Sequence, residues 1–417
     1  MQESTELRSD NPAAAVTSAL SGEIARPNAR RLAIAAYVSI AFLYWIALYT
    51  YVPTLPTYVQ SKTANLAAVG PVLSMYGLWQ MIVRLPLGII ADRIGRRKPF
   101  ILGGLVLVGL GAWIMGSTST TAGLTIGRAV TGLAAATWVP LVVVFSSLFP
   151  AEEAVRASAI LTLVGSVGRI FATAANGPLN NLGGYPLAFW IAVGVAAVAL
   201  VLATTVQEKR NPPKQPSAKS IGRLITRRDV LLPALLSATV QFATWATTFG
   251  FLPILAKGLG ANDVTLSTMV TLNLIMGMLG NLTATTLVGR LGAARLAIVS
   301  FVLLSAGIAL TALLHSLPYI TIAQLGVGLA TGVAYPVMMG MSIRYVADAE
   351  RATAMGLHQS VYAAGMFLGP WLGGILADAF GIREMFGVTA LLVLVVGLIG
   401  SRLLTERQRV VGSGQVS

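Results

Sequence analysis

Twelve runs of predominantly apolar residues, each long enough to cross a lipid bilayer, constrain this chain more than any other feature. A membrane-spanning helix needs about 20 such residues, because the hydrocarbon core of a bilayer is roughly 30 Å thick. We therefore predict an all-α integral membrane protein with twelve spans. The predicted spans cover residues 32–54, 66–91, 99–117, 122–147, 155–181, 186–206, 230–255, 264–289, 295–315, 318–343, 352–378 and 384–404.

The composition excludes most other classes of protein. Charged residues make up only 11% of the 417 residues, whereas soluble domains carry about 25%. A soluble enzyme, a secreted disulfide scaffold and a disordered chain are all incompatible with this balance. The chain has no Cys, which removes thiol nucleophiles and Cys-based metal sites. We expect no cofactor, no metal and no nucleic-acid partner.

The basic residues predict the topology. Twenty-three of the 29 Lys and Arg residues fall on the side of the predicted spans that both termini share. The opposite loops hold only Lys62, Lys257 and Arg383. By the positive-inside rule, both termini are cytoplasmic, in a plasma membrane of bacterial inner-membrane type. The predicted organisation is a polar tail (1–31), a six-helix bundle (32–206), a basic solvated linker (207–229), a second six-helix bundle (230–405) and a tail (406–417).

An internal repeat supports the division into two bundles. The triplet from Gly132 to Ala134 recurs 196 residues later, from Gly328 to Ala330. The segment that begins at Arg156 recurs 195 residues later, at Arg351. Near-identical offsets in different spans indicate that the two halves are copies of one six-span unit. We predict two pseudo-symmetric bundles.

One short motif carries a family resemblance. Residues 88–98 read GIIADRIGRRK, at the end of the second predicted span. This segment resembles the signature of the major facilitator superfamily, and the twelve spans and the repeat extend the resemblance over the whole membrane part. Asp92 suits the positive end of a helix, and the arginines can bind carboxylates and helix-end carbonyls. We predict a cytoplasmic conformational latch formed by Gly88, Asp92, Arg93, Gly95, Arg96 and Arg97.

A glycine pattern marks the eleventh span. It resembles a motif that exporters of the same superfamily carry in the fifth span, so it favours export only slightly. Close helix packing and a kink explain it without any direction of transport. The predicted packing residues are Gly356, Gly365, Gly369, Pro370, Gly373 and Gly374.

Polar residues inside the spans predict the transport pathway, because such residues are costly in lipid and usually face a cavity. The third, sixth, ninth and twelfth spans are almost purely apolar, and in the resembled family these lie outermost. In the fifth span, Thr162, Ser166, Arg169, Thr173, Asn176 and Asn180 share one helical face. The predicted pathway residues are Arg169, Arg84, Gln80, Tyr76, Arg128, Thr173, Asn176, Gln241, Trp245, Gln324, His358, Gln359 and Tyr362.

The charges in the spans indicate the chemistry of the solute. None of the 15 acidic residues lies in the middle of a span, yet Arg84, Arg128 and Arg169 lie within spans. An unpaired buried charge is expensive, so water, backbone carbonyls, span-end acids or an anionic solute must compensate these arginines. His358 is the only midspan side chain that titrates near neutral pH, so it is the candidate for binding a coupling proton. The alternative is that it only forms a hydrogen bond.

The sequence therefore predicts a secondary active transporter that moves a small organic anion or zwitterion by alternating access. The alternative is a proton-coupled exporter of hydrophobic drugs. A membrane sensor or a membrane enzyme finds little support, because the chain has no soluble output domain, acidic pair or His cluster. The expected partners are a small-molecule solute, the lipid bilayer and either H+ or a counter-anion. We expect a functional monomer.

Overall fold

The computed structural model describes residues 27–208, 218–347 and 350–413, and within these ranges all regular structure is helical. The helices of the first half are α2 (Pro27–Tyr49), η1 (Val52–Thr54), α3 (Leu55–Gln60), α4 (Leu66–Ile94), α5 (Lys98–Ser117), α6 (Thr121–Ala135), α7 (Trp138–Ser146), η2 (Ala151–Glu153) and α8 (Ala154–Thr205). The remaining helices are α9 (Ala218–Thr226), α10 (Arg228–Ala246), η3 (Thr247–Phe251), α11 (Leu252–Gly258), α12 (Asp263–Leu291), α13 (Ala293–Leu313), α14 (Leu317–Ile343), α15 (Arg351–Phe380) and α16 (Ile382–Ser413).

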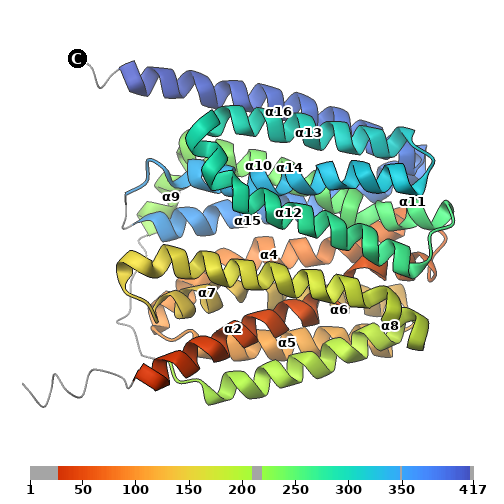
Figure 1. Cartoon of the computed structure of the whole chain (residues 1–417), viewed down its shortest axis with the longest axis horizontal. Helices are drawn as coiled ribbons and strands as arrows, with labels where there is room; N and C mark the ends of the chain where they lie inside the picture. Colours follow the sequence, from red (N-terminus) through yellow and green to blue (C-terminus); the bar gives the residue numbers. More distant parts are fainter. Residues whose placement is uncertain (1–26, 209–217, 348–349, 414–417) are drawn as a thin grey trace, which may run out of the picture.

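Eleven helical segments of the described chain are long and apolar enough to span a membrane, and one of them is double. That segment is Arg156–Thr205, with 50 residues, which as a single helix would be about 75 Å long. Non-helical backbone at Gly183 and Gly184 divides it, and Gly184 has a φ of 68°, a conformation that glycine adopts without strain. The two arms of α8 run in opposite directions (Figure 1). The described part of the chain therefore provides twelve membrane-spanning segments, as predicted.

Both halves repeat the same packing. In the first half α4 packs on α6 and α5 packs on α8, and in the second half α12 packs on α14 and α13 packs on α16. The first crossing of each half is also interrupted at an equivalent place, around Val52–Thr54 and around Thr247–Phe251. The halves lie side by side and meet mainly along α4 with α15 and α8 with α12 (Figure 1). The predicted fold of two pseudo-symmetric six-helix bundles is confirmed.

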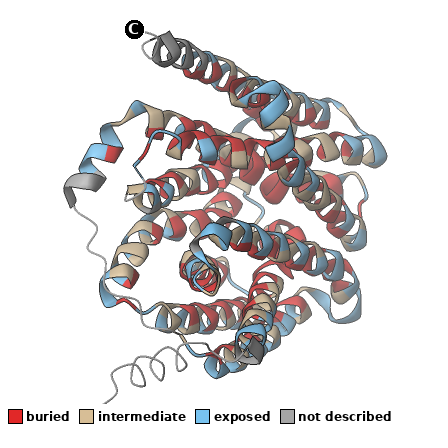
Figure 2. Cartoon of the chain, turned by 60° about the vertical axis from the view of Figure 1, so that its left-hand side comes forward, coloured by how far each residue is buried: buried red, intermediate tan, exposed pale blue. Residues whose placement is uncertain are grey.

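The helix α2 begins, and α16 ends, at one end of the bundle, on the left in Figure 1. We call this the terminal end and the opposite one the far end. Exposed faces run along the outside of the bundle and buried faces point between helices (Figure 2). Large apolar side chains such as Trp113, Val198, Leu313 and Leu391 are exposed on α5, the second arm of α8, α13 and α16. These are the four spans that were predicted to face lipid.

The predicted solvated linker needs a correction. Part of it forms α9, whose Leu224 is fully buried in a small cluster with Val230, Val346 and Leu357. The linker is therefore partly packed against the second half, because an apolar side chain within it finds a cover. The polar tail 1–26, the proline-containing stretch 209–217 and residues 414–417 lie outside the described residues.

Helix α15 packs against the backbone of two other helices through its glycines. A Cβ added at Gly365 would lie 2.0 Å from the carbonyl oxygen of Ala238, and one at Gly369 would lie 2.4 Å from that of Phe242. On another side, a Cβ at Gly374 would lie 3.0 Å from the Cα of Gly70. The pattern 356–374 therefore brings α15 into backbone contact with α10 and with α4.

Candidate functional site

A cavity of about 210 Å³ lies between the two halves, and both halves contribute to its wall. Its lining comes from the first, second, fourth and fifth crossings and from the seventh, eighth, tenth and eleventh. Eight of the predicted pathway residues line it: Tyr76, Gln80, Arg84, Arg169, Gln241, Trp245, Gln359 and Tyr362. A central cavity shared by two bundles is where such folds place their ligand site.

Arg169 is held by aromatic rings. Its guanidinium lies 4.7 Å from the ring centre of Trp45 and 5.8 Å from that of Tyr49. One terminal nitrogen donates to Ser166 Oγ at 2.9 Å, because residues three apart on a helix share a face. The Nε atom is buried and has no hydrogen-bond partner in the described chain. Cation–π contacts fix this charge without neutralising it.

Arg84 is the second cation of the wall. It donates to Gln80 Oε1 at 2.5 Å, and Gln80 Nε2 in turn donates to the carbonyl oxygen of Tyr76 at 3.1 Å. The spacing of four residues on α4 brings the three side chains onto one face. Among the described residues that line the cavity, none is Asp or Glu, so the wall carries a formal charge of +2.

The second half contributes aromatic and amide groups. Trp245 Nε1 donates to Gln241 Oε1 at 3.1 Å. The rings of Tyr335 and Tyr362 meet edge to face, with their centres 5.5 Å apart. Trp245 also stacks on Tyr76 of the first half, with 5.2 Å between the ring centres. The two halves therefore touch through aromatic rings in the cavity wall itself.

Two predicted pathway residues of α8 lie outside the cavity wall. Thr173 Oγ1 accepts from Thr271 Oγ1 at 2.9 Å, and Asn176 Oδ1 accepts from Thr54 Oγ1 at 2.9 Å and from Ser267 Oγ at 3.2 Å. The polar stripe of α8 thus has two parts: Thr162, Ser166 and Arg169 line the cavity, whereas the rest joins the two halves nearer the far end. A shared helical face does not distinguish these two environments.

Three further predictions also need correction, because packing buries these side chains away from the cavity. The Arg128 guanidinium lies 4.4 Å from the ring centre of Tyr76. Gln324 bonds with Thr248 and Thr311. His358 Nδ1 lies 2.7 Å from Ser342 Oγ. All three are 0–1% exposed and are held by neighbouring side chains.

The sequence reasoning missed the contribution of the eighth crossing. Asn273, Gly277 and Asn281 of α12 line the cavity, and so do Tyr49 and Phe249 beside the interruptions of the first and seventh crossings. The two amides lie eight residues apart with Gly277 midway, which places all three on one helical face. That spacing in the sequence could have predicted that the eighth crossing lines the pathway.

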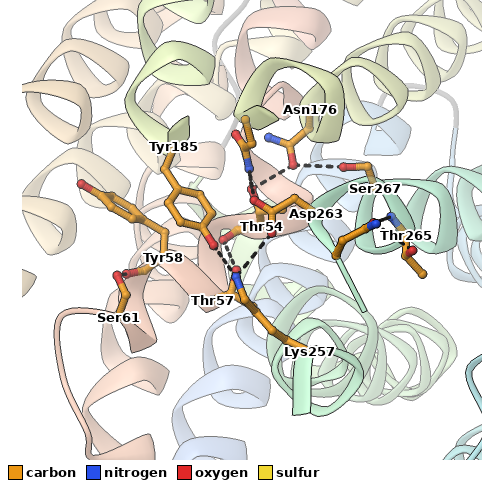
Figure 3. A network of polar contacts seen from close by, with 12 residues as sticks. Thr54, Thr57, Tyr58, Ser61, Asn176, Tyr185, Lys257, Asp263, Thr265 and Ser267 are labelled. Atoms are coloured by element: carbon orange, nitrogen blue, oxygen red, sulfur yellow. Dashed lines mark hydrogen bonds and ion pairs between the residues drawn. The ribbon is translucent and has the colours of Figure 1, made fainter. Parts of the chain in front are cut away.

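A polar network joins the two halves at the far end of the bundle (Figure 3). Asp263 of α12 accepts from Asn180 Nδ2 of α8 at 2.9 Å and pairs with Lys257 at 3.4 Å. Lys257 donates to the Tyr185 hydroxyl of the first half at 2.7 Å. At the same end, the amide of Leu66 donates to Asp378 Oδ1 at 3.1 Å. We call Tyr185, Asn180, Lys257 and Asp263 the far-end gate; it ties the first half to the second.

Two helices that line the cavity carry exposed side chains toward the terminal end. Ala159 of α8 and Thr285 of α12 continue the cavity-facing rows of their helices toward that end, and both are exposed. The described contacts of the latch at that end stay within the first half and Glu208, which follows it. In the predicted latch, Asp92 forms an ion pair with Arg97. The backbone amides of Arg97 and Lys98 donate to Glu208 at 2.7 and 2.8 Å.

The amino-acid sequence matches a known family along most of its length. The family model of the Major Facilitator Superfamily matches residues 37–244 and again 234–414. The inner membrane transport protein YajR of Escherichia coli is 31% identical over 161 residues, which cover 38% of this chain and 34% of that protein. The chain therefore aligns with only about a third of that relative's length. An uncharacterized MFS-type transporter of Methanocaldococcus jannaschii is 23% identical over 88% of this chain and 98% of that protein.

Solved structures share the same fold. The nucleoside transporter NupG superposes with a TM-score of 0.70 at 17% identity, over 89% of this chain and 99% of that one. The human organic anion transporter MFSD10 superposes with a TM-score of 0.67 at 15% identity, over 89% of this chain and 99% of that one. At these identities the likeness concerns the fold alone.

Proposed function

Because this chain belongs to the major facilitator superfamily, we propose that it is a secondary active transporter of a small organic anion. It is a multi-pass membrane transporter and not an enzyme. The substrate class, the mechanism and the orientation are our proposal. The proposed substrate class rests on one observation, namely that the described residues of the cavity wall carry a formal charge of +2 and include no carboxylate.

Burial of the two arginines favours an anionic ligand. Opposite charges interact several-fold more strongly at a partly buried site than in water, and an unpaired buried cation is costly. The Nε atoms of Arg84 and Arg169 are both buried without a partner in the described chain. A carboxylate or phosphate bound between the halves would compensate both charges. A cationic drug would add a third positive charge, which counts against the alternative of a cationic-drug exporter.

The mechanism that we propose is alternating access by a rocking of the two bundles. The far-end gate holds the halves together on one side, and the cavity faces the other. With 23 of 29 basic residues on the terminal side, the positive-inside rule makes that side cytoplasmic. The described conformation is then inward-facing. We propose that the pathway comprises the lining residues, and that the latch around Asp92 acts at the cytoplasmic end.

Uptake by proteoliposomes tests this function. Purified protein is reconstituted, and uptake of radiolabelled organic anions is compared with uptake of lipophilic cations. We expect anion uptake that Arg169→Gln lowers at least tenfold, because a charged hydrogen bond contributes about 1.5–3 kcal/mol. Arg295→Gln, which removes an exposed arginine of α13, is the matched control and should transport normally. Uptake of cations alone, unchanged in Arg169→Gln, would refute the proposal and leave the drug exporter.

A further inference from the structure

We infer that the preferred ligand of the cavity is an aromatic carboxylate, in which a planar ring carries the anionic group. This inference deepens the proposed function and rests on it. The positive charge of the wall selects for an anion but does not distinguish among the many organic carboxylates. The aromatic side chains of the same wall indicate a ring in the ligand.

The cavity is unusually rich in aromatic side chains. Eight of the 24 lining residues are aromatic, whereas only 7% of the whole chain is aromatic. Both halves contribute four of them: Trp45, Tyr49, Tyr76 and Trp138 from the first, and Trp245, Phe249, Tyr335 and Tyr362 from the second. A ligand between the halves therefore meets aromatic rings from both sides.

The rings and the positive charges occupy the same part of the cavity. Arg169 lies directly against Trp45 and Tyr49, and Arg84 is linked through Gln80 to Tyr76. Tyr335 and Tyr362 line the same cavity as both guanidinium groups. When the carboxylate of a ligand pairs with these arginines, the rest of the ligand must lie among the rings.

The aromatic pairs in the wall favour a flat ring over a saturated one. Tyr335 and Tyr362 meet edge to face, and both line the cavity, where a third ring can join them in the offset or edge-to-face arrangements that aromatic rings prefer. Aromatic pairs contribute roughly 0.5–1.5 kcal/mol beyond the buried area, which corresponds to about a 2- to 12-fold difference in affinity. A puckered aliphatic ring of the same size gains only the area.

Neutral polar side chains also line the cavity and can donate and accept hydrogen bonds. They include Gln241, Asn273, Asn281, Thr331 and Gln359. They leave the charge of the wall unchanged. Ring substituents such as hydroxyl groups would find partners there.

The experiment compares four probes of similar size, namely benzoate, cyclohexanecarboxylate, benzamide and benzylammonium. Their affinities for the purified full-length protein are measured by competition with radiolabelled benzoate and, for each probe, by calorimetry. We expect benzoate to bind about 3- to 10-fold more tightly than cyclohexanecarboxylate. Benzamide and benzylammonium should bind at least tenfold more weakly than benzoate, because they lack the negative charge.

Two variants locate the aromatic preference. Tyr362→Leu removes the ring and keeps an apolar side chain, so the benzoate-to-cyclohexanecarboxylate ratio should fall toward one. Tyr362→Phe keeps the ring and should keep the ratio. Retained binding of cyclohexanecarboxylate in Tyr362→Leu shows that the variant is folded. A ratio that stays unchanged in Tyr362→Leu overturns the assignment of the ring to this part of the cavity.

The outcomes separate this inference from the proposed function. If both carboxylates bind equally, or the saturated one binds more tightly, the aromatic inference fails and organic anion transport stands. If only benzylammonium binds, or no probe binds although uptake of another solute is measured, the inference fails. The benzylammonium result would overturn the anion proposal as well.

Discussion

Removing one negative charge from the far-end gate should shift the conformation of the whole transporter. Asp263 is the carboxylate that accepts from Asn180 across the boundary between the halves, at 2.9 Å. Its side chain is 16% exposed, so water screens the bond only in part. Asp263→Asn keeps the volume of the side chain and removes its charge. We expect the far end to open more often in this variant.

The magnitude follows from the one contact of Asp263 that crosses the boundary. A hydrogen bond to a charged group contributes about 1.5–3 kcal/mol, against about 0.5–1.5 kcal/mol for a neutral one. The ion pair of Asp263 with Lys257 lies within the second half, so its loss affects the closed and the open state alike. The closed state should therefore lose about 1–1.5 kcal/mol, which shifts the equilibrium by roughly 5- to 12-fold toward the open far end.

Double electron–electron resonance measures this shift. The chain contains no Cys, so Ser119→Cys and His315→Cys, in exposed far-end turns of the two halves, give one spin-label pair. Asp263→Asn should increase the fraction of long distances. Glu384→Gln is the matched control. Glu384 also lies in the first turn of a helix that begins at the far end, α16, and it makes no described bond to the first half. Equal distance distributions in Asp263→Asn and the control would refute the gate.

Three further predictions concern packing and the latch. Gly365→Ala should lower the Tm by the equivalent of about 1–3 kcal/mol, because its Cβ would overlap a carbonyl oxygen of α10; Gly340→Ala, with nothing within 4 Å of its Cβ, should not. His358→Leu should cost about 1 kcal/mol through the lost bond to Ser342 and retain transport, so an abolished uptake in a folded variant would contradict a packing role. Asp92→Asn, which breaks a described ion pair, should lower the maximal transport rate in proteoliposomes and leave the KM unchanged.

The sequence reveals the fold because lipid imposes simple length and polarity rules on it. Twelve apolar runs, an offset of about 196 residues and the four apolar outer spans suffice to predict two similar bundles. The same rules point to Arg84 and Arg169, because a charge within an apolar run is rare enough to stand out. These features belong to single helices and need no knowledge of which helices meet.

Only the tertiary structure decides which polar residues face a ligand. Arg128 and Arg169 are alike as cations within spans, yet packing buries Arg128 against Tyr76 and leaves Arg169 in the cavity wall. Asn176 shares a helical face with Arg169, but α12 approaches α8 closely enough there to bond with it. Lys257 and Asp263 read as ordinary loop charges until the first half places Tyr185 and Asn180 against them, across the boundary between the halves. Helical periodicity fixes the direction of a side chain, whereas the partner it meets depends on contacts between residues far apart in the chain.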